Sequence, residues 1–384
     1  MTGLPAFAVV APYLPAPANT GGRIRIHRLA LALARHGPVD LYARFWPVEL
    51  APAAGDPTAA LSVYRHRVLR GAGWPTGLVP GWHPKRAREA APFKLRRALF
   101  DAHARVPYQA VVVCHSYAMG VVRGMRGAAL VLDEHNVESR YAAALRPDDR
   151  AESDRLARWE RACWREADAV TCVSDDDAAE IARWGAEATV IPNGVAAREL
   201  AFVAPSERPS RELLFVGSMS HPPNVAAAVE LAREVLPRVK RAFPEARAVL
   251  CGRAPSPEVL ALAAPDVTVT GTVPDPAPLL ARAGAYVNLL RAGAGSSLKV
   301  PEAMAAGVPL VTTAVGARGF AVRDGVHARI AESVDDVAAA VCEAWRDPAA
   351  ADARARAARS LAEALDWGAV GARFAAVVLG AAGA

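Results

Sequence analysis

Residues 291–320, with the sequence RAGAGSSLKVPEAMAAGVPLVTTAVGARGF, combine a glycine-rich loop with one lysine and one glutamate near an expected helix start. The small residues 293–297 would let a ligand approach the backbone closely, and free N–H groups at a helix start favour phosphate. Lys299 and Glu302 are three residues apart, so on a helix they share a face, where the ammonium could meet a phosphate and the carboxylate a ribose hydroxyl. This pattern predicts a nucleotide diphosphate site. An ordinary loop and helix with a solvated lysine and glutamate would explain the segment about equally well.

The rest of the chain supplies the elements that could position such a site. At 384 residues it suits two α/β domains of roughly 190 residues each. A first sheet is expected from strands at 7–11, 39–42, 110–114, 130–133, 169–173 and 189–191. A second sheet is expected from strands at 213–216, 248–251, 267–270, 285–290, 309–313 and 328–330. Expected helices include 24–35, 151–166 and a short one at 302–306 that should end at Gly307. Doubly wound parallel sheets bind ligands at the carboxyl ends of their strands, here in the crevice between the two sheets.

The expected domain boundary lies near residue 195. Residues 1–195 would form the first Rossmann-like domain and residues 196–365 the second. The polar, proline-bearing stretch 196–211 is predicted to be the linker. An apolar helix at about 366–384 could pack back on the first domain.

Seven short stretches in a fixed order resemble one enzyme family. They are NTGGRIR at 19–25, VLDEHNVESR at 131–140, IPNGV at 191–195, LLFVGSM and PPN within 213–224, VLCGR at 249–253, VTVTGTVPD at 267–275 and LKVPEAMAAGVPLVTTAVGARGF at 298–320. Together they resemble the retaining GT-B glycosyltransferases of family 4, the glycosyl transferases group 1, over nearly the whole chain. The resemblance implies two Rossmann-like domains that face a central cleft, with the donor bound mainly by the second domain and the acceptor by the first.

The resemblance also implies a reaction. A sugar would pass from a UDP- or GDP-linked donor to a hydroxyl of a small-molecule, glycan or lipid-linked acceptor, with retention of the anomeric configuration and without a cofactor. No enzyme nucleophile is evident, so the departing phosphate would itself help to deprotonate the acceptor in a front-face substitution. A nucleotide-sugar epimerase and a non-catalytic nucleotide-sugar-binding protein remain alternatives.

Particular residues match the family's site. Those expected to bind the donor nucleotide are Gly21, Gly22, Arg23, Gly217, Ser218, Arg253, Val273, Gly295, Ser296, Ser297, Leu298, Lys299 and Glu302. Gly21 and Gly22 would bring N–H groups near the donor phosphate or the acceptor, unless they form only a tight turn between strand and helix. Gly217 and Ser218 would face the diphosphate, Val273 would line the base pocket through its main chain, and Glu302 would hold the ribose.

The expected catalytic residues are His135 and Lys299. The resemblance places His135 near the anomeric centre, where its imidazole could bind a sugar hydroxyl or the acceptor. A lone histidine after a strand is more often a structural hydrogen-bonding group, but Asp133, Glu134 and Asn136 surround this one with polar groups. Lys299 would neutralise the leaving diphosphate.

Two departures from the family pattern concern the donor. Ala294 stands where many members carry a glutamate that contacts the transferred sugar, which leaves recognition of the sugar open. The loop 217–224 also lacks the usual arginine and lysine and offers only His221 as a cation. Lys299 and Arg253 are the expected replacements, since a leaving diphosphate needs its growing charge stabilised.

Neither a metal nor a disulfide is expected. The acidic run 175–177 follows Ser174 at a predicted helix start, where carboxylates cap the helix and suit its dipole. The five cysteines lie in apolar contexts without close pairing, which favours reduced thiols in a cytoplasmic protein.

Charge singles out one segment. The formal net charge of +6 is modest, and no nucleic-acid-binding motif accompanies it. Residues 65–105 are rich in arginine and contain Trp74 and Trp82, which predicts contact with an anionic lipid surface or phosphorylated acceptor. A solvated face of a helix near 94–103 is the competing interpretation. No signal peptide or membrane span is evident, so a cytoplasmic protein, peripheral at most to the inner membrane surface, is expected.

Overall fold

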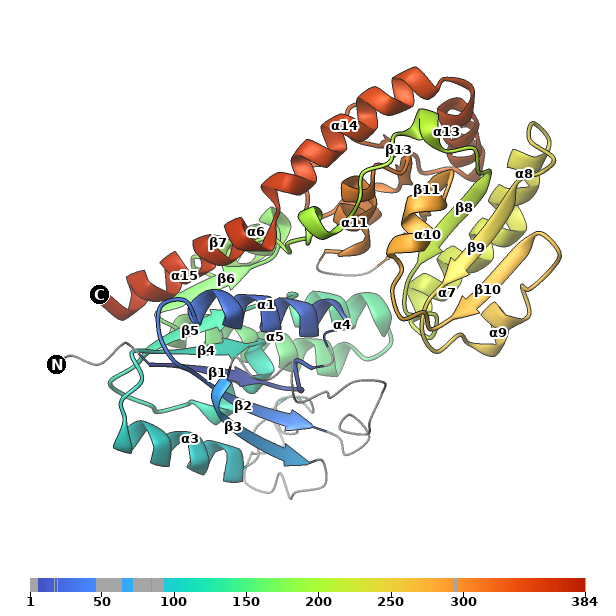
Figure 1. Cartoon of the computed structure of the whole chain (residues 1–384). Coiled ribbons are helices and arrows are strands. Elements are labelled where there is room, and N and C mark those ends of the chain that lie inside the picture. The colour runs from blue at the N-terminus through green and yellow to red at the C-terminus, as the bar shows by residue number, and fades with distance from the viewer. Residues whose placement is uncertain are drawn as a thin grey trace. The chain divides into compact units, whose positions relative to one another are not determined.

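The computed structural model describes residues 6–16, 18, 20–45, 64–71, 84, 93–292 and 296–383. The chain divides into two compact units. Unit 1 contains residues 1–193 and 367–384, and unit 2 contains residues 194–366. Each unit is built on one parallel β-sheet with helices packed against it (Figure 1). The predicted α/β fold class, with two doubly wound parallel sheets, is confirmed.

The sheet of unit 1 has seven strands in the order β3-β2-β1-β4-β5-β6-β7. They are β1 Phe7–Ala11, β2 Val39–Phe45, β3 Tyr64–Gly71, β4 Ala110–Cys114, β5 Ala129–Asp133, β6 Ala169–Cys172 and β7 Thr189–Val190. Six of them match the expected strands, and β3 was missed. β3 pairs with β2 at the edge of the sheet, and its sequence YRHRVLRG is too rich in charged residues to show a buried apolar run.

Helices cover both faces of this sheet. They are α1 Gly21–Leu33, α3 Phe93–Arg105, the 3₁₀ helix η3 Ser116–Val121, α4 Glu138–Leu145, α5 Arg150–Glu166, α6 Asp175–Arg183 and α15 Trp367–Gly383. The C-terminal helix α15 packs beside α1 and against the central strands β4, β5 and β6, whereas α3 and α5 pack with η3 (Figure 1). Among the described residues, none of the helices has the length and apolar character that crossing a membrane requires.

The sheet of unit 2 has six strands in the order β10-β9-β8-β11-β12-β13. They are β8 Glu212–Val216, β9 Arg247–Cys251, β10 Val267–Gly271, β11 Ala285–Asn288, β12 Leu310–Thr312 and β13 Arg329–Ile330, close to the six expected. Both sheets share the Rossmann strand order, whose direction of winding reverses at the first strand. That reversal lies between β1 and β4 in unit 1, and between β8 and β11 in unit 2.

Alternate side chains of these strands build two apolar cores, one on each face of the sheet. Leu213 and Phe215 join the core on one face, and Leu214 and Val216 join the core on the other. The covering helices are α7 Pro222–Glu230, the π-helical turn η6 Leu231–Val235, α8 Leu236–Lys240, α9 Pro257–Leu260, α10 Ala277–Arg282, α11 Lys299–Ala306, α12 Ala314–Ala317, α13 Val334–Arg346 and α14 Pro348–Ala364.

The predicted linker at 196–211 was wrong. The segment belongs to unit 2 and contains two short 3₁₀ helices, η4 Ala197–Glu199 and η5 Pro205–Glu207. Arg208 is only 5% exposed, and its guanidinium donates to the backbone oxygens of Leu280 at 2.7 Å and Ala306 at 2.6 Å. A cation at the carboxyl ends of α10 and α11 is stabilised by the helix dipoles. The arginine that made this segment look like a polar linker is therefore a buried residue that binds the ends of two helices.

Candidate functional site

A buried ion pair lies at the carboxyl end of β5 in unit 1. Arg25 of α1 binds Asp133, the last residue of β5, through Nε at 2.9 Å and Nη2 at 2.6 Å. Both side chains are at most 1% exposed. Thr171 of β6 also donates to Asp133, at 2.7 Å. Burial alone would raise the pKa of Asp133, but the Arg25 charge and a hydrogen bond from His135 outweigh it and hold the pKa far below its usual range.

His135 is held by the same carboxylate. Its Nε2 lies 3.0 Å from Oδ2 of Asp133, and because the carboxylate can only accept, Nε2 carries the proton. Burial, and then the neighbouring His115, lower the pKa of His135 to about 4, so the imidazole is neutral near pH 7. The other nitrogen, Nδ1, is then a bare acceptor, and it is buried without a hydrogen-bond partner among the described residues.

A second histidine stands against His135. His115 follows β4, and its ring centroid lies 4.1 Å from that of His135. Its Nδ1 donates to Oε1 of Glu138 at 3.1 Å, and its Nε2 lies 3.0 Å from the hydroxyl of Tyr13. His115 has a φ of 68°, a left-handed conformation that costs energy for a non-glycine residue.

Two further buried carboxyls, those of Glu134 and Glu160, bind the segments next to His135. Glu134 accepts hydrogen bonds from Trp164 Nε1 at 3.0 Å and from the Ser116 backbone at 3.1 Å. Glu160 of α5 caps the start of α4 by accepting from the backbone of Glu138 and Ser139. Burial raises the pKa of Glu160 to about 8 and that of Glu134 well above its usual range. These groups hold the loop after β5 in place.

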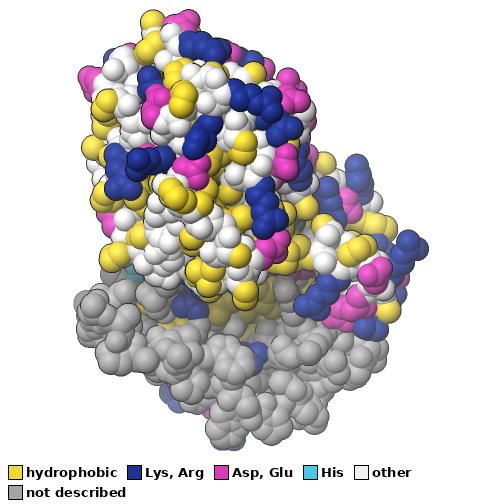
Figure 2. Space-filling model, turned by 90° about the vertical axis from the view of Figure 1, so that its right-hand side faces the viewer, with side chains coloured by type: hydrophobic (Ala, Val, Ile, Leu, Met, Phe, Trp, Pro, Cys, Tyr) yellow, Lys and Arg dark blue, Asp and Glu magenta, His cyan; other side chains and the backbone are white. Residues whose placement is uncertain are grey.

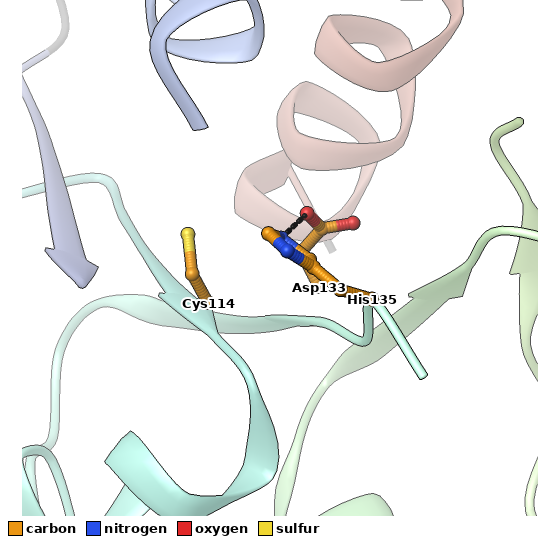
Figure 3. Close-up of side chains that lie close together, drawn as sticks. All are labelled: Cys114, Asp133 and His135. Carbon is orange, nitrogen blue, oxygen red and sulfur yellow. Dashed lines mark hydrogen bonds and ion pairs between the residues drawn. The ribbon is translucent and has the colours of Figure 1, made fainter. Parts of the chain in front are cut away.

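Cys114, Asp133 and His135 place three potential ligand atoms within 4.8 Å of one another (Figure 3). The chemistry of the group does not favour a cation. Both oxygens of Asp133 are engaged by the Arg25 guanidinium, and burial raises the pKa of the Cys114 thiol well above its usual range. The acidic run 175–177 lies in the first turn of α6 as predicted, but the cap is the Ser174 hydroxyl, which accepts from the Asp177 backbone. All five cysteines are buried and none is paired with another.

In unit 2, two loops meet at the carboxyl ends of β8 and β9. The Gly217 backbone N–H donates to the Cys251 carbonyl at 3.0 Å, and Met219 donates to the Arg253 carbonyl at 2.9 Å. A Cβ at Gly252, whose φ is 154°, would lie 1.6 Å from the Gly217 oxygen, so this approach requires glycine.

Two side chains of these loops make few or no hydrogen bonds within the described residues. Ser218 is half-buried, and within the described residues its hydroxyl makes only a long contact of 3.5 Å with Ser220. Arg253 is exposed, and its guanidinium has no hydrogen bond or ion pair within the described residues. Burial lowers the pKa of His221, so this residue is not a cation near neutral pH.

Lys299 and Glu302 form an ion pair at the start of α11. Lys299 Nζ lies 3.1 and 2.8 Å from the two carboxylate oxygens of Glu302, and the side chains are 30% and 20% exposed. The helix begins three residues earlier than predicted, because Pro301 is tolerated in a first turn. It ends at Gly307 as predicted, with a left-handed φ of 74°.

The other predicted donor-binding residues of unit 2 lie around α11. Ser296 and Ser297 are half-buried just before α11, and Leu298 is buried. The charge of Lys299 is felt by Cys251 at the end of β9. Burial raises the pKa of the Cys251 thiol, and a hydrogen bond with Thr270 and the charge of Lys299 partly offset this rise. Val273 packs on the core beside α11.

The other predicted residues lie in unit 1 or have no described position. Gly21, Gly22 and Arg23 form the first turn of α1. Gly295 and Ala294 lie outside the described residues.

Solved structures share this fold along nearly the whole chain. Sucrose-phosphate synthase from Thermosynechococcus elongatus is 20% identical, with a TM-score of 0.73 over 96% of this chain and 97% of that chain. HepE from Anabaena, solved in complex with UDP, is 14% identical, with a TM-score of 0.72 over 98% and 100%. A glycosyltransferase from Rickettsia africae is 10% identical, with a TM-score of 0.62 over 97% of each. A comparison with the curated proteins finds no match.

Family models match each half of the sequence. The Glycosyltransferase Family 4 model matches residues 20–199, and the glycosyl transferases group 1 model matches residues 210–347. The chain is a glycosyltransferase of the GT-B type. The family resemblance predicted from the short stretches is confirmed at this level.

The sequence did not reveal every polar residue around His135 in the glycosyltransferase. Arg25, Tyr13, His115 and Glu138 were missed as members of one cluster. Arg25 and Asp133 are 108 positions apart, so no local spacing could pair them. A usable signal existed for His115, because it directly follows an apolar strand, as His135 nearly does.

Proposed function

We propose that this glycosyltransferase moves a sugar from a nucleotide diphosphate donor to an acceptor hydroxyl with retention of configuration. The observation that carries the proposal is the end of the unit 2 sheet. There the half-buried Gly217 and Ser218, the Arg253 guanidinium, which is unpaired within the described residues, and the Lys299–Glu302 pair come from adjacent elements. HepE was solved with UDP and with UDP-glucose, which supports a nucleotide-sugar donor here.

The diphosphate would take the cations of this region. Arg253 needs to break no contact within the described residues to reach a phosphate. Lys299 donates to Glu302 through one ammonium group, which has three hydrogens and can serve a phosphate at the same time. Glu302 would then accept from a ribose hydroxyl. These two cations would replace the arginine and lysine that the family usually places in the loop after β8.

The proton of the acceptor would pass to the departing phosphate. Asp133 is committed to Arg25 and Thr171, so it is a poor general base. His135 is neutral, with Nε2–H fixed toward Asp133, so Nδ1 can accept a hydrogen bond from a hydroxyl near the reacting carbon. A neutral imidazole in this position orients a hydroxyl without separating charge. This arrangement favours front-face substitution.

Stereochemistry tests the proposal most directly. Thermal shift with UDP and GDP would first identify the base, because a ligand that binds the native state raises the melting temperature. The matching α-linked sugar donor would then be supplied with an acceptor screen, and proton NMR would read the anomeric coupling of the first product. We expect an α-linked product. A β-linked product would contradict retention, and an isomerised donor without acceptor would indicate an epimerase.

A peripheral contact with anionic lipid is also proposed for the basic segment 65–105. Only 65–71, 84 and 93–105 of it are described. There α3 exposes Phe93 by 58% and the Arg97 side chain by 72%, an apolar and a basic group near one helix end. On the face shown in Figure 2, by contrast, basic and acidic side chains are intermixed. Co-sedimentation with phosphatidylglycerol vesicles should fall in Arg97→Glu, and equal sedimentation of both proteins would remove the proposal.

A further inference from the structure

Two hydrogen-bond acceptors without donors face the first turn of α1. One is Nδ1 of His135, which is buried and unpartnered among the described residues. The other is the Tyr13 hydroxyl oxygen, on the loop between β1 and α1. A Cβ built at Gly22 would lie 2.1 Å from the Tyr13 hydroxyl and 3.5 Å from Nδ1 of His135, so both atoms lie against the same glycine.

Buried carboxylates fix the direction of both groups. Asp133 takes the Nε2 proton of His135. Oε1 of Glu138 also accepts from Asn136, at 3.2 Å, so the His115 proton that it receives must be on Nδ1. In the neutral imidazole the other nitrogen, Nε2, is then a lone pair, and the Tyr13 hydroxyl donates to it. The tyrosine oxygen is left with lone pairs only, since no second partner for it is found among the described residues.

The backbone of His115 supports a positioning role. Its φ of 68° places the ring between Tyr13 and Glu138, with Tyr117 stacked at a centroid distance of 4.7 Å. A strained conformation persists only where its surroundings hold it, and such residues cluster at ligand sites. The side chain is 5% exposed and that of Glu138 is 2% exposed, so this chain of hydrogen bonds is shielded from water.

We infer that Tyr13 is a substrate-binding residue whose oxygen, beside His135 Nδ1, accepts hydrogen bonds from sugar hydroxyls, with His115 and Glu138 as positioning residues. The inference rests on the proposed function for its choice of a sugar. The two acceptor atoms favour a ligand that brings hydroxyl protons to them, and they disfavour an analogue in which those protons are replaced. Because Nδ1 is covered in the free protein, the Tyr13 side chain must move aside for a ligand to reach it.

The test uses the full-length protein with ¹⁵N-labelled histidine. NMR spectra are recorded with methyl α-glucoside, methyl α-mannoside and methyl α-galactoside, and His135→Gln assigns the His135 signal. At least one glycoside should shift the Nδ1 resonance, and its fully O-methylated derivative should not. Tyr13→Phe should weaken that glycoside's affinity on the order of tenfold, the loss of about one hydrogen bond. The inference is wrong if no glycoside shifts the signal, or if the O-methylated sugar binds equally.

Matched variants separate binding from structure. Tyr42→Phe removes another buried hydroxyl of unit 1, which lies 2.6 Å from Tyr108, and it should leave glycoside affinity unchanged. Glu138→Ala should disturb the His115 tautomer seen by NMR and weaken the sugar, whereas Glu138→Gln keeps an accepting oxygen and should restore both. Equal glycoside affinity in Tyr13→Phe and wild type would overturn the inference. If the glycoside results hold but no nucleotide sugar is turned over, the proposed function fails alone.

Discussion

The two units each place an ion pair near the carboxyl ends of their strands, and the pairs differ in burial. Arg25 and Asp133 in unit 1 are almost completely buried, and Asp133 receives two hydrogen bonds from the guanidinium. Lys299 and Glu302 in unit 2 are 30% and 20% exposed and lie on one turn of helix. A buried pair cannot exchange its partner without a large cost, whereas a half-exposed pair can. Unit 1 therefore holds its ion pair in one fixed arrangement, whereas the ion pair of unit 2 can rearrange to bind a ligand.

The largest expected effect is the loss of the buried cation. Arg25→Met keeps the apolar part of the side chain but leaves Asp133 buried without its cation, which should lower the unfolding free energy by about 3 to 5 kcal/mol. The matched change Lys299→Met should cost less than about 1 kcal/mol. Urea unfolding of both variants measures the difference. Similar losses in the two would show that burial does not distinguish the pairs.

A pH dependence should follow from His135. Its folded pKa is about 4 and its unfolded pKa about 6.5, so the unfolded state binds more protons between these values. The unfolding free energy should therefore fall as pH drops through this window, by up to about 3 kcal/mol from this residue. Urea unfolding at pH 7 and pH 4.5 measures it. His135→Gln should flatten that part of the profile, and an unchanged slope would mean that the imidazole is not held neutral.

The alternation of apolar strands with helices along the chain made the fold largely predictable from the sequence. The exceptions have physical causes. β3 is an edge strand with a charged sequence, and the segment at 196–211 looked like a linker because its buried Arg208 satisfies helix ends rather than water. The start of α11 was placed too late because Pro301 resembles a helix breaker.

The sites were predictable only where neighbours in sequence are neighbours in space. Lys299 and Glu302 pair as their spacing indicated. Asp133 and His135 meet across two positions. The hydrogen bonds from Tyr13 to His115 and from Arg25 to Asp133 each join residues more than 100 positions apart, and only the parallel strand order brings them together. The roles of the individual residues toward a donor stay predictions.

In unit 2, where the ion pair is partly exposed, we expect removal of the cation to lower activity more than stability. Lys299→Ala should lower turnover of the nucleotide-sugar donor on the order of a hundredfold, because one charge that stabilises the leaving diphosphate is removed. Lys240→Ala removes a lysine of similar exposure that pairs with Asp266, and turnover should not change. Steady-state rates with UDP- or GDP-linked sugars measure this. Activity of Lys299→Ala within a few-fold of wild type would exclude it from the diphosphate site.

Glu302→Gln is a milder change because it keeps the size of the side chain and removes only the charge. If Glu302 accepts from the ribose, nucleotide binding should weaken by about 1 to 3 kcal/mol. Isothermal titration with UDP and GDP measures the affinity, and Asp266→Asn serves as the control of similar exposure. Unchanged affinity in Glu302→Gln would mean that the carboxylate only pairs with Lys299.

The smallest effect is expected from a chelator, and it tests whether the buried frame of unit 1 is built by the ion pair alone. A cation among Cys114, Asp133 and His135 would have to displace Arg25 from Asp133 and ionise a thiol whose pKa burial raises. Both steps are costly, so treatment with EDTA should leave turnover and melting temperature nearly unchanged. The opposite result would be loss of activity that zinc restores in the wild type but not in Cys114→Ser. That outcome would replace the fixed ion pair by a metal centre and reverse the contrast between the two units.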